Sequence, residues 1–217
     1  MSNPTLLRVD TSIRVEGSTS RNLTDLAVGS WQRVNPTGKV VVRDLASDPV
    51  PHFDATAQTA RPRKDLSHEQ QARADLADEL AREVADATSL VIGMPLYNWG
   101  PPSQLKAWFD HLIASPIARD PQTMAPGLQL DAAILVVARG GAYGDTTPRA
   151  GWDHATDWAQ KSFTAVGIDL HVVAVEMTLA PGAPYLADFE HIYHRDLAAA
   201  EETLDTVWTD RLLERIN

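Results

Sequence analysis

Five short apolar runs alternate with helical patterns along the whole chain, and this alternation constrains the fold more than any other feature. The run AAILVVA at 132–138 is apolar at every position, as in a strand that is buried on both faces of a sheet. Strands that alternate with helices form a parallel sheet, which the helices cover on both sides. We interpret five runs as strands: Leu6–Asp10, Lys39–Leu45, Ser89–Gly93, Ala132–Ala138 and Leu170–Val175.

The segments between these runs carry helical spacing and capping signals. Ser67 and Gln70 form a capping-box signature, which opens a helix that ends near Ala87. An earlier helix is indicated by apolar residues close to the i, i+3, i+4 spacing: Leu23, Leu26, Ala27, Trp31 and Val34. We expect further helices from about Ser103, from about Pro148 to Val166 and from about Ala187 to Arg215, with irregular loops over 48–65 and 115–130.

Right-handed crossovers reduce the possible topologies to a doubly wound α/β sheet, whose five-stranded version has the order 2-1-3-4-5. Ligands of such sheets bind beyond the carboxyl ends of the strands, at the switch point between strands one and three. The sequence contains no repeat, low-complexity tract or interdomain linker, so we expect residues 1–217 to form a single domain.

Composition excludes several classes of protein. A formal net charge of −10 argues against a nucleic-acid binder, which needs a basic face for the phosphates. The absence of cysteine excludes disulfides, thiolate metal sites and a cysteine nucleophile. No apolar run approaches the roughly 20 residues of a membrane span, and no signal-peptide pattern opens the chain. We therefore expect a cytoplasmic protein without nucleic-acid or membrane partners.

The loop after the first strand, Thr11 to Arg21, is rich in hydroxyl groups. It lacks both the GxGxxG fingerprint of dinucleotide folds and the GxxxxGK[ST] phosphate loop. Hydroxyls beside the free amides of a helix N-terminus can cradle one phosphate monoester. The alternative is that Ser18 or Ser20 only caps the helix, because serine is a favoured N-cap.

The stretch MPLYNWGPP, which begins at Met94, follows the third strand and lies at the expected binding edge. A plain connection between a strand and a helix needs only a few polar turn residues. A planar ring fits against the backbone of Pro95 to Trp99, with aromatic contact from Tyr97 or Trp99 and a polar contact from Asn98. The alternative is that both aromatic residues pack over the following helix. The rigid Pro-Pro pair and the switch-point location favour a binding site.

The third loop, Ala138-Arg-Gly-Gly-Ala-Tyr-Gly144, follows the fourth strand. Its paired glycines, Gly140 and Gly141, let the backbone approach a flat ligand closely. Arg139 is placed either to stabilise an electron-rich ring edge or to form an ion pair. The motif is weak alone, but the loops after strands one, three and four converge on one crevice.

Three segments together carry a family resemblance. They are Ser12-x5-Ser18-Thr-Ser20, Pro95-Leu-Tyr-Asn-Trp-x4-Gln-Leu-Lys-x2-Phe-Asp110 and Ala138-Arg-Gly-Gly-x-Tyr143. This combination resembles the FMN-dependent NADH-azoreductases, also described as FMN-dependent NADH:quinone oxidoreductases, which are flavodoxin-like homodimers. The resemblance extends from the first strand to the last. It implies non-covalent FMN and two-electron ping-pong hydride transfer from NADH or NADPH to a quinone or an aromatic azo compound.

The resemblance also implies which residues contact the flavin. Those that would hold its phosphate are Ser12, Ser18, Thr19 and Ser20. Those that would line or contact its ring are Pro95, Leu96, Tyr97, Asn98, Trp99, Ala138, Arg139, Gly140, Gly141 and Tyr143. No side chain is expected to act as a general acid or base. Ala138 stands where a serine is common, and residues 115–130, a region that helps to cover the flavin in the family, include no aromatic residue.

One helix also bears on the expected homodimer. Trp108, Phe109, Leu112 and Ile113 give this helix more apolar surface than one face of a sheet needs. These side chains suggest an interface between two copies of the chain, and the alternative is that all four belong to the core.

Two other functions stay open. A flavodoxin-type electron carrier would bind FMN without being a reductase, and a flavin-free interaction protein would only retain the fold. Other features carry less weight: His191 and His194 have helical spacing but no third metal ligand nearby, and the Gly-x-Ser-x-Gly elbow of serine hydrolases is absent.

Overall fold

Five parallel strands form the centre of the molecule, in the predicted order β2-β1-β3-β4-β5. The computed structural model describes residues 3–214. The strands are β1 (Thr5–Asp10), β2 (Lys39–Asp44), β3 (Ser89–Pro95), β4 (Ala132–Ala138) and β5 (Leu170–Val175). β3 and β4 are buried at every position, as expected for central strands with helices on both faces, whereas β2 is a half-buried edge strand.

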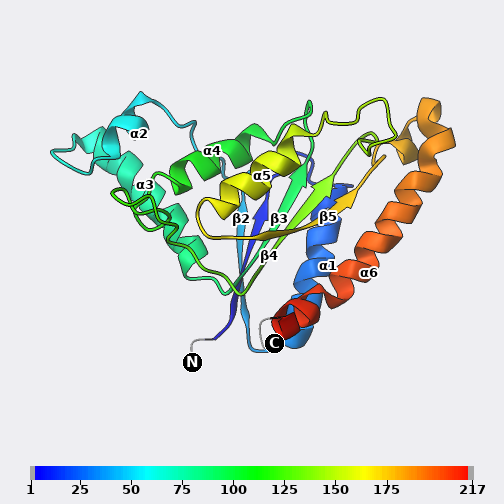
Figure 1. Cartoon of the computed structure of the whole chain (residues 1–217), viewed down its shortest axis with the longest axis horizontal. Coiled ribbons are helices and arrows are strands. Elements are labelled where there is room, and N and C mark those ends of the chain that lie inside the picture. The colour runs from blue at the N-terminus through cyan, green and yellow to red at the C-terminus, as the bar shows by residue number, and fades with distance from the viewer. Residues whose placement is uncertain (1–2, 215–217) are drawn as a thin grey trace.

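Helices cover both faces of this sheet (Figure 1). They are α1 (Thr19–Val34), α2 (Ala55–Ala60), α3 (His68–Ala85), α4 (Ser103–Leu112), α5 (His154–Thr164) and α6 (Glu190–Glu214), with short 3-10 helices η1 (Ala180–Gly182) and η2 (Pro184–Phe189). α1 and α6 lie on one face, whereas α3, α4 and α5 lie on the other. Each face has its own apolar core, and no helix within residues 3–214 is long and apolar enough to cross a membrane.

Capping residues explain two differences between the predicted and observed helices. The segment 48–65 was predicted to be irregular, but Asp54 accepts a hydrogen bond of 2.8 Å from the amide of Ala57 and begins α2. α5 begins at His154 and not near Pro148, because the side chain of Asp153 caps its first turn. The predicted capping box at Ser67 and Gln70 is present.

Two further details of the helices differ from the sequence pattern. Of the apolar residues that indicated α1, Leu26 and Val34 are exposed, and the buried ones are Leu23, Ala27 and Trp31. The last helix begins at Glu190, because the residues before it form η2, and Arg215 lies outside the described residues.

The apolar residues of α4 pack inside the chain. The rings of Trp108 and Phe163 stack with their centroids 6.1 Å apart, and Phe109 lies against Phe163 and Trp158 of α5 at 5.1 and 5.8 Å. Trp108, Phe109 and Leu112 are buried, and Ile113 is partly buried against the same core. These residues therefore do not form an exposed interface, and the sequence argument that took them for one was wrong.

α4 also carries a buried histidine. The Nε2 atom of His111 lies 3.1 Å from the carbonyl oxygen of Pro51, and its ring packs edge-on against Phe53. The Nδ1 atom has no hydrogen-bond partner among the residues that the structure describes. Burial lowers the pKa of His111 below its ordinary value of 6.5, and the Pro51 carbonyl offsets this only in part.

The stability of the fold should therefore depend on the protonation of His111. Below about pH 6.5 the unfolded chain takes up a proton that the folded chain resists, so the free energy of unfolding falls as the pH drops through this value. Urea denaturation at a series of pH values should show a shallower decline between about pH 7 and 5 for His111→Gln than for the wild type. Identical slopes would show that His111 does not contribute.

Candidate active site

Two adjoining cavities open at the edge where the strands end. The first has a volume of about 460 Å³ and is lined by Ser12, Ile13, Arg14, Gly17, Ser18, Thr19, Ser20, Pro95, Leu96, Tyr97, Ala138, Gly140, Thr178 and Leu179. The second has a volume of about 690 Å³ and shares Leu96, Gly140 and Leu179 with the first. Both volumes are typical of small-molecule sites. The shared residues make the two cavities one cleft.

The hydroxyl groups of the first loop form the floor of the first cavity. Ser18 is the N-cap of α1, and its hydroxyl accepts a hydrogen bond of 3.4 Å from the amide of Arg21. The same hydroxyl lies 3.3 Å from that of Ser20. The amides of the first helical turn have no acceptor within the helix, so they add donors at its positive end. Ser18 is both a cap and a cavity residue, so the two alternatives for this loop do not exclude each other.

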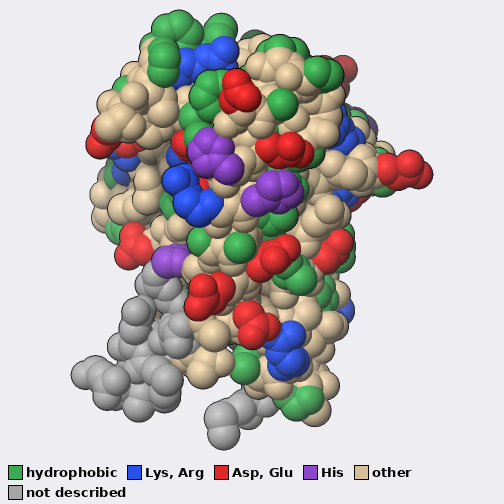
Figure 2. Space-filling model, turned by 90° about the vertical axis from the view of Figure 1, so that its right-hand side faces the viewer, with side chains coloured by type: hydrophobic (Ala, Val, Ile, Leu, Met, Phe, Trp, Pro, Cys, Tyr) green, Lys and Arg blue, Asp and Glu red, His purple; other side chains and the backbone are tan. Residues whose placement is uncertain are grey.

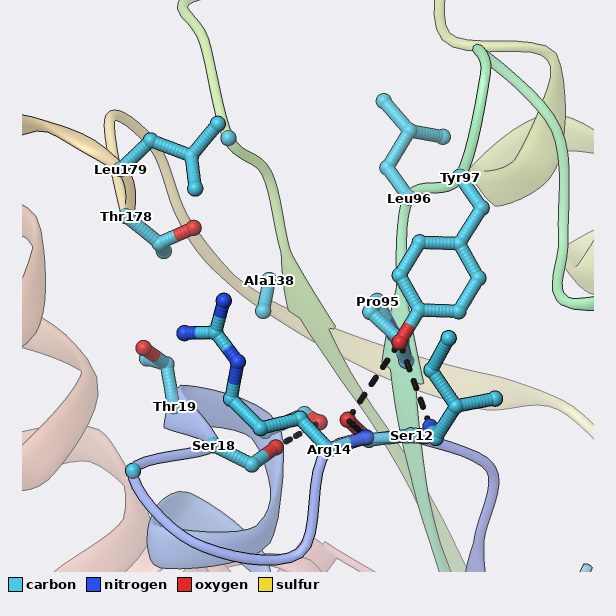
Figure 3. Close-up of a pocket in the computed structure, with 14 residues that line it drawn as sticks. Ser12, Arg14, Ser18, Thr19, Pro95, Leu96, Tyr97, Ala138, Thr178 and Leu179 are labelled. Atoms are coloured by element: carbon cyan, nitrogen blue, oxygen red, sulfur yellow. Dashed lines mark hydrogen bonds between the residues drawn. The ribbon is translucent and has the colours of Figure 1, made fainter. Parts of the chain in front are cut away.

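Tyr97 connects the first loop to the loop after β3. Its hydroxyl accepts a hydrogen bond of 3.3 Å from the amide of Ile13 and lies 3.5 Å from the hydroxyl of Ser12 (Figure 3). Below it, the Thr11 hydroxyl donates a 2.7 Å hydrogen bond to the carbonyl oxygen of Gly93. Tyr97 therefore holds two walls of the first cavity together.

The loop after β3 is a tight turn with unusual backbone geometry. Reciprocal hydrogen bonds of 3.1 and 3.0 Å join Tyr97 and Gly100, while Asn98 and Trp99 have φ values of 48° and 67°. Two successive positive φ values define a type I′ turn, which favours asparagine and glycine and strains a bulky residue. Trp99 is held there by Trp152, whose ring lies edge-on at 5.4 Å. The contact with Trp152 and a 2.9 Å hydrogen bond from the amide of His154 to the carbonyl oxygen of Trp99 offset this strain, and Trp99 lies at the rim of the second cavity.

A partly buried ion-pair network supports the first loop. The Arg21 guanidinium donates hydrogen bonds of 2.8 and 3.0 Å to the carboxylate of Asp44 and lies 3.5 Å from Asp10. It also donates to the carbonyl oxygens of Ser12 and Arg14 at 2.8 and 3.1 Å. The hydrogen bonds from Arg21 hold the pKa of Asp44 below its ordinary value. Arg21 thus fixes the loop backbone but has no free charge for a ligand.

The glycine loop rests on the loop after β5. The amides of Met177 and Thr178 donate hydrogen bonds to the carbonyl oxygens of Gly141 and Arg139 at 3.2 and 2.9 Å. Thr178 and Leu179 line the first cavity, although the sequence argument named neither residue. The predicted strand order could have identified this loop. Because β5 lies beside β4 and runs parallel to it, the loop after β5 begins at the same edge of the sheet as the glycine loop.

Arg139 forms ion pairs and does not line the cleft. Its guanidinium lies 2.7 Å from Asp153 and 3.1 Å from Glu176, and it is absent from the lining of both cavities. Burial alone would raise the pKa of Asp153, but hydrogen bonds from Thr156 and the charge of Arg139 outweigh it and lower that pKa. Of the two alternatives for Arg139, the structure therefore shows the ion pair.

Two other arginines line the cleft, and the sequence argument missed both. Among the described residues, Arg14 is the one charged residue in the lining of the first cavity, and Figure 3 shows its guanidinium pointing into the cavity above Ser18 and Thr19. Arg149 is the one charged residue that the described part of the chain contributes to the lining of the second. Within residues 3–214, the structure shows no ion pair or side-chain hydrogen bond for either guanidinium. No sequence motif marks either arginine as a site residue. The groups that surround each side chain are determined by the fold and not by the adjacent residues in the sequence.

Comparison with known proteins agrees with this arrangement. A family model described as flavodoxin-like fold matches residues 4–202. The FMN-dependent NADH:quinone oxidoreductase of Frankia alni is 39% identical over 204 residues, which cover 93% of this chain and 97% of that protein. This chain belongs to the flavodoxin-like family of FMN-dependent NADH:quinone oxidoreductases. A relative of the same name from Xanthobacter autotrophicus is 42% identical over 156 residues, 70% of this chain and 75% of the relative.

Solved structures of low sequence identity support the fold. An azoreductase from Bacillus anthracis superposes with a TM-score of 0.77 at 21% identity, covering 94% of this chain and 99% of that one. An FMN-dependent NADH-azoreductase from the same species, solved in complex with FMN, superposes with a TM-score of 0.75 at 20% identity over the same shares of the two chains.

The cleft contains almost all the residues that the family resemblance singles out. The hydroxyl residues, Pro95 and Tyr97 line the first cavity together with Ala138. Asn98, Trp99, Gly141 and Tyr143 line the second, and Leu96 and Gly140 line both. Arg139 alone lies outside, although its backbone joins the glycine loop to the loop after β5.

The histidine pair on α6 shows no metal-binding arrangement. Nδ1 of His191 lies 2.9 Å from the carbonyl oxygen of Asp188, and the ring of His194 packs against Tyr193. Within residues 3–214, no group of three or more histidine, aspartate or glutamate side chains is placed to hold a metal ion.

The type I′ turn predicts different effects for two substitutions of Asn98. Asn98→Gly should leave the free energy of unfolding unchanged or slightly higher, because glycine adopts positive φ without strain. Asn98→Ala should lower it by about 1 kcal/mol, because alanine is strained there. Urea denaturation of both variants measures the difference. Equal losses would mean that the amide side chain, and not the backbone conformation, is what stabilises the turn.

Proposed function

We propose that this protein is an FMN-dependent NADH:quinone oxidoreductase that reduces quinones or aromatic azo compounds. The observation that carries the proposal is the cleft itself, where the hydroxyl-rich N-terminus of α1 faces the glycine loop across one cavity. Its relatives in Frankia alni and Xanthobacter autotrophicus bear the name of this activity.

The first cavity fits the phosphate end of FMN. Serine hydroxyls and free helical amides are the donors that a phosphate monoester needs, and Arg14 supplies a positive charge in a chain whose net charge is −10. Ser12, Ser18, Thr19 and Ser20 would hold the phosphate. The absence of a glycine fingerprint favours a mononucleotide over a dinucleotide with a pyrophosphate.

The flavin ring would lie where the two cavities meet. Leu96 and Gly140 line both cavities, and Trp99 and Gly141 line the second. A planar ring can approach the backbone of the glycine loop closely, because Gly140 and Gly141 carry no side chains. Ala138 lines the wall without a hydroxyl group, so the serine contact that is common in the family is missing.

The chain itself contributes orientation and electrostatics. Bound FMN supplies two-electron hydride chemistry, with NADH or NADPH as donor. The described residues that line the two cavities include no carboxylate and no histidine, so we propose that the reaction needs no obligatory side-chain acid or base. The amides of Gly140 and Gly141 would stabilise negative charge at the ring edge.

The volume of the second cavity favours a reductase over an electron carrier. A carrier covers its flavin, whereas a reductase keeps room beside the ring for the donor and then for the acceptor. A cavity of about 690 Å³ that shares a wall with the proposed ring site provides this room. We therefore propose that NADH and the acceptor use the second cavity in turn.

A comparison of two flavins tests the phosphate site. Arg14→Gln should weaken FMN binding about tenfold, because a partly exposed charge-assisted hydrogen bond is lost. Riboflavin has no phosphate, so its affinity should not change. Fluorescence titration measures both dissociation constants. Arg82→Gln removes an exposed arginine in the last turn of α3 and should change neither. An unchanged FMN affinity in Arg14→Gln would remove Arg14 from the site.

Steady-state kinetics test the shared cavity. Initial rates are measured with FMN-loaded protein while NADH and a quinone are varied together. Parallel double-reciprocal lines are expected, because the oxidised nicotinamide leaves before the quinone binds. Intersecting lines would mean that both bind at once. An absence of turnover with NADH, NADPH and a panel of quinones and azo dyes would favour the electron carrier.

We also propose that the enzyme is a homodimer in the cytoplasm, where NADH is available. Residues 115–130 line neither cavity of their own chain, although the resemblance assigns this region to the flavin cover. A second copy of the chain would allow them to cover a flavin in the partner. Light scattering should give about twice the chain mass of 23.7 kDa, and the monomer mass would contradict the dimer.

A further inference from the structure

The second cavity combines aromatic walls with one positive charge. Its aromatic lining residues come from three separate segments: Trp99, Tyr143, Tyr185 and Phe189. Three of them are substantially exposed, Trp99 at 43%, Phe189 at 47% and Tyr185 at 79%. Figure 2 shows hydrophobic side chains, with basic ones beside them, at the upper end of the face that includes α6. Exposed aromatic surface of this kind is typical of a ligand-binding site.

Arg149 lies directly on the glycine loop. A methyl group added to Gly141 would come within 2.8 Å of a terminal nitrogen of its guanidinium. The guanidinium has no ion pair or hydrogen bond to another side chain in the described part of the molecule, whereas Arg21 and Arg139 are each bound to two carboxylates. The second cavity therefore has an uncompensated positive charge beside the proposed ring site.

We propose that Arg149 makes this cavity selective for aromatic acceptors that carry an anionic group, such as a carboxylate or a sulfonate. This inference rests on the proposed function and names its substrate class. The aromatic walls bind the acceptor ring, and the guanidinium binds the anionic substituent through paired hydrogen bonds. A neutral acceptor gains only the aromatic contacts, and a cationic one meets repulsion from Arg149.

A matched pair of acceptors tests the selectivity. The pair consists of a naphthoquinone sulfonate and neutral methylnaphthoquinone, each assayed with wild type, Arg149→Gln and Arg149→Lys. Arg149→Gln should lower kcat/KM about tenfold for the sulfonate and less than about twofold for the neutral quinone. Arg149→Lys should retain part of the preference. With wild type, kcat/KM for the sulfonate should fall as salt is added, because the interaction is electrostatic.

A second arm separates the acceptor from the other possible source of negative charge, the pyrophosphate of NADH. In ping-pong kinetics kcat/KM is determined separately for each substrate, so the proposal predicts that Arg149→Gln lowers this ratio much less for NADH than for the quinone sulfonate. An equal loss for both quinones would place the action of Arg149 on the bound cofactor and overturn the proposal. A loss confined to NADH would assign Arg149 to the nucleotide and also overturn it.

A measurement of acceptor binding without turnover tests this inference separately from the proposed function. Anthraquinone sulfonate and a neutral hydroxymethyl anthraquinone are titrated against FMN-loaded protein, with quenching of tryptophan fluorescence as the signal. The sulfonate should bind about tenfold more weakly to Arg149→Gln, the neutral compound should not, and Arg82→Gln should match wild type. Equal affinities in wild type and Arg149→Gln would refute the inference even if NADH-dependent turnover is found. A failure of turnover with every acceptor would refute the proposed function alone.

Discussion

The parallel pairing of the central strands is the constraint on which the site depends. Asp10 of β1 pairs with Gly93 of β3, Pro95 of β3 pairs with Ala138 of β4, and Ala138 pairs in turn with Val175 of β5. Because these strands all point the same way, four loops from distant parts of the sequence begin at one edge. The cleft follows from this register, and the helices on both faces hold it by burying β3 and β4 completely.

Charge at this edge is divided between structure and ligand binding. Arg21 and Arg139 are committed to carboxylates and brace the loops from which the walls are built. Arg14 and Arg149 line the cavities, and within the described residues their guanidinium groups have no ion pair or side-chain hydrogen bond. In a chain with a net charge of −10, two uncompensated arginines create a local positive field where an anionic cofactor and anionic acceptors would bind.

Much of this arrangement could be predicted from the sequence, because it depends on local periodicity. Continuous apolar runs indicated the strands, and alternation with helices gave their order. The strand order alone placed the loops after β1, β3 and β4 at the edge of the sheet where the strands end. No information about side-chain positions was needed. Ala138 and the hydroxyl residues of the first loop line the cleft for this reason.

The remaining features depend on contacts between segments that are remote in the sequence. Arg139 turns away from the cleft because Asp153 and Glu176 reach it from two other segments. Trp108 and Phe109 are core residues because α5 packs against them, which the spacing within α4 does not reveal. The strained turn at Trp99 likewise depends on Trp152, a residue of a later loop.

The central claim is that the loops after β1, β3, β4 and β5 form a single FMN site, with the phosphate at the N-terminus of α1. A crystal structure of the protein soaked with FMN tests it most directly. The account predicts the phosphate within hydrogen-bond distance of Ser18 and the amide of Ser20, and the ring between Leu96 and Gly140. A phosphate bound away from α1, or a ring outside the two cavities, would contradict it.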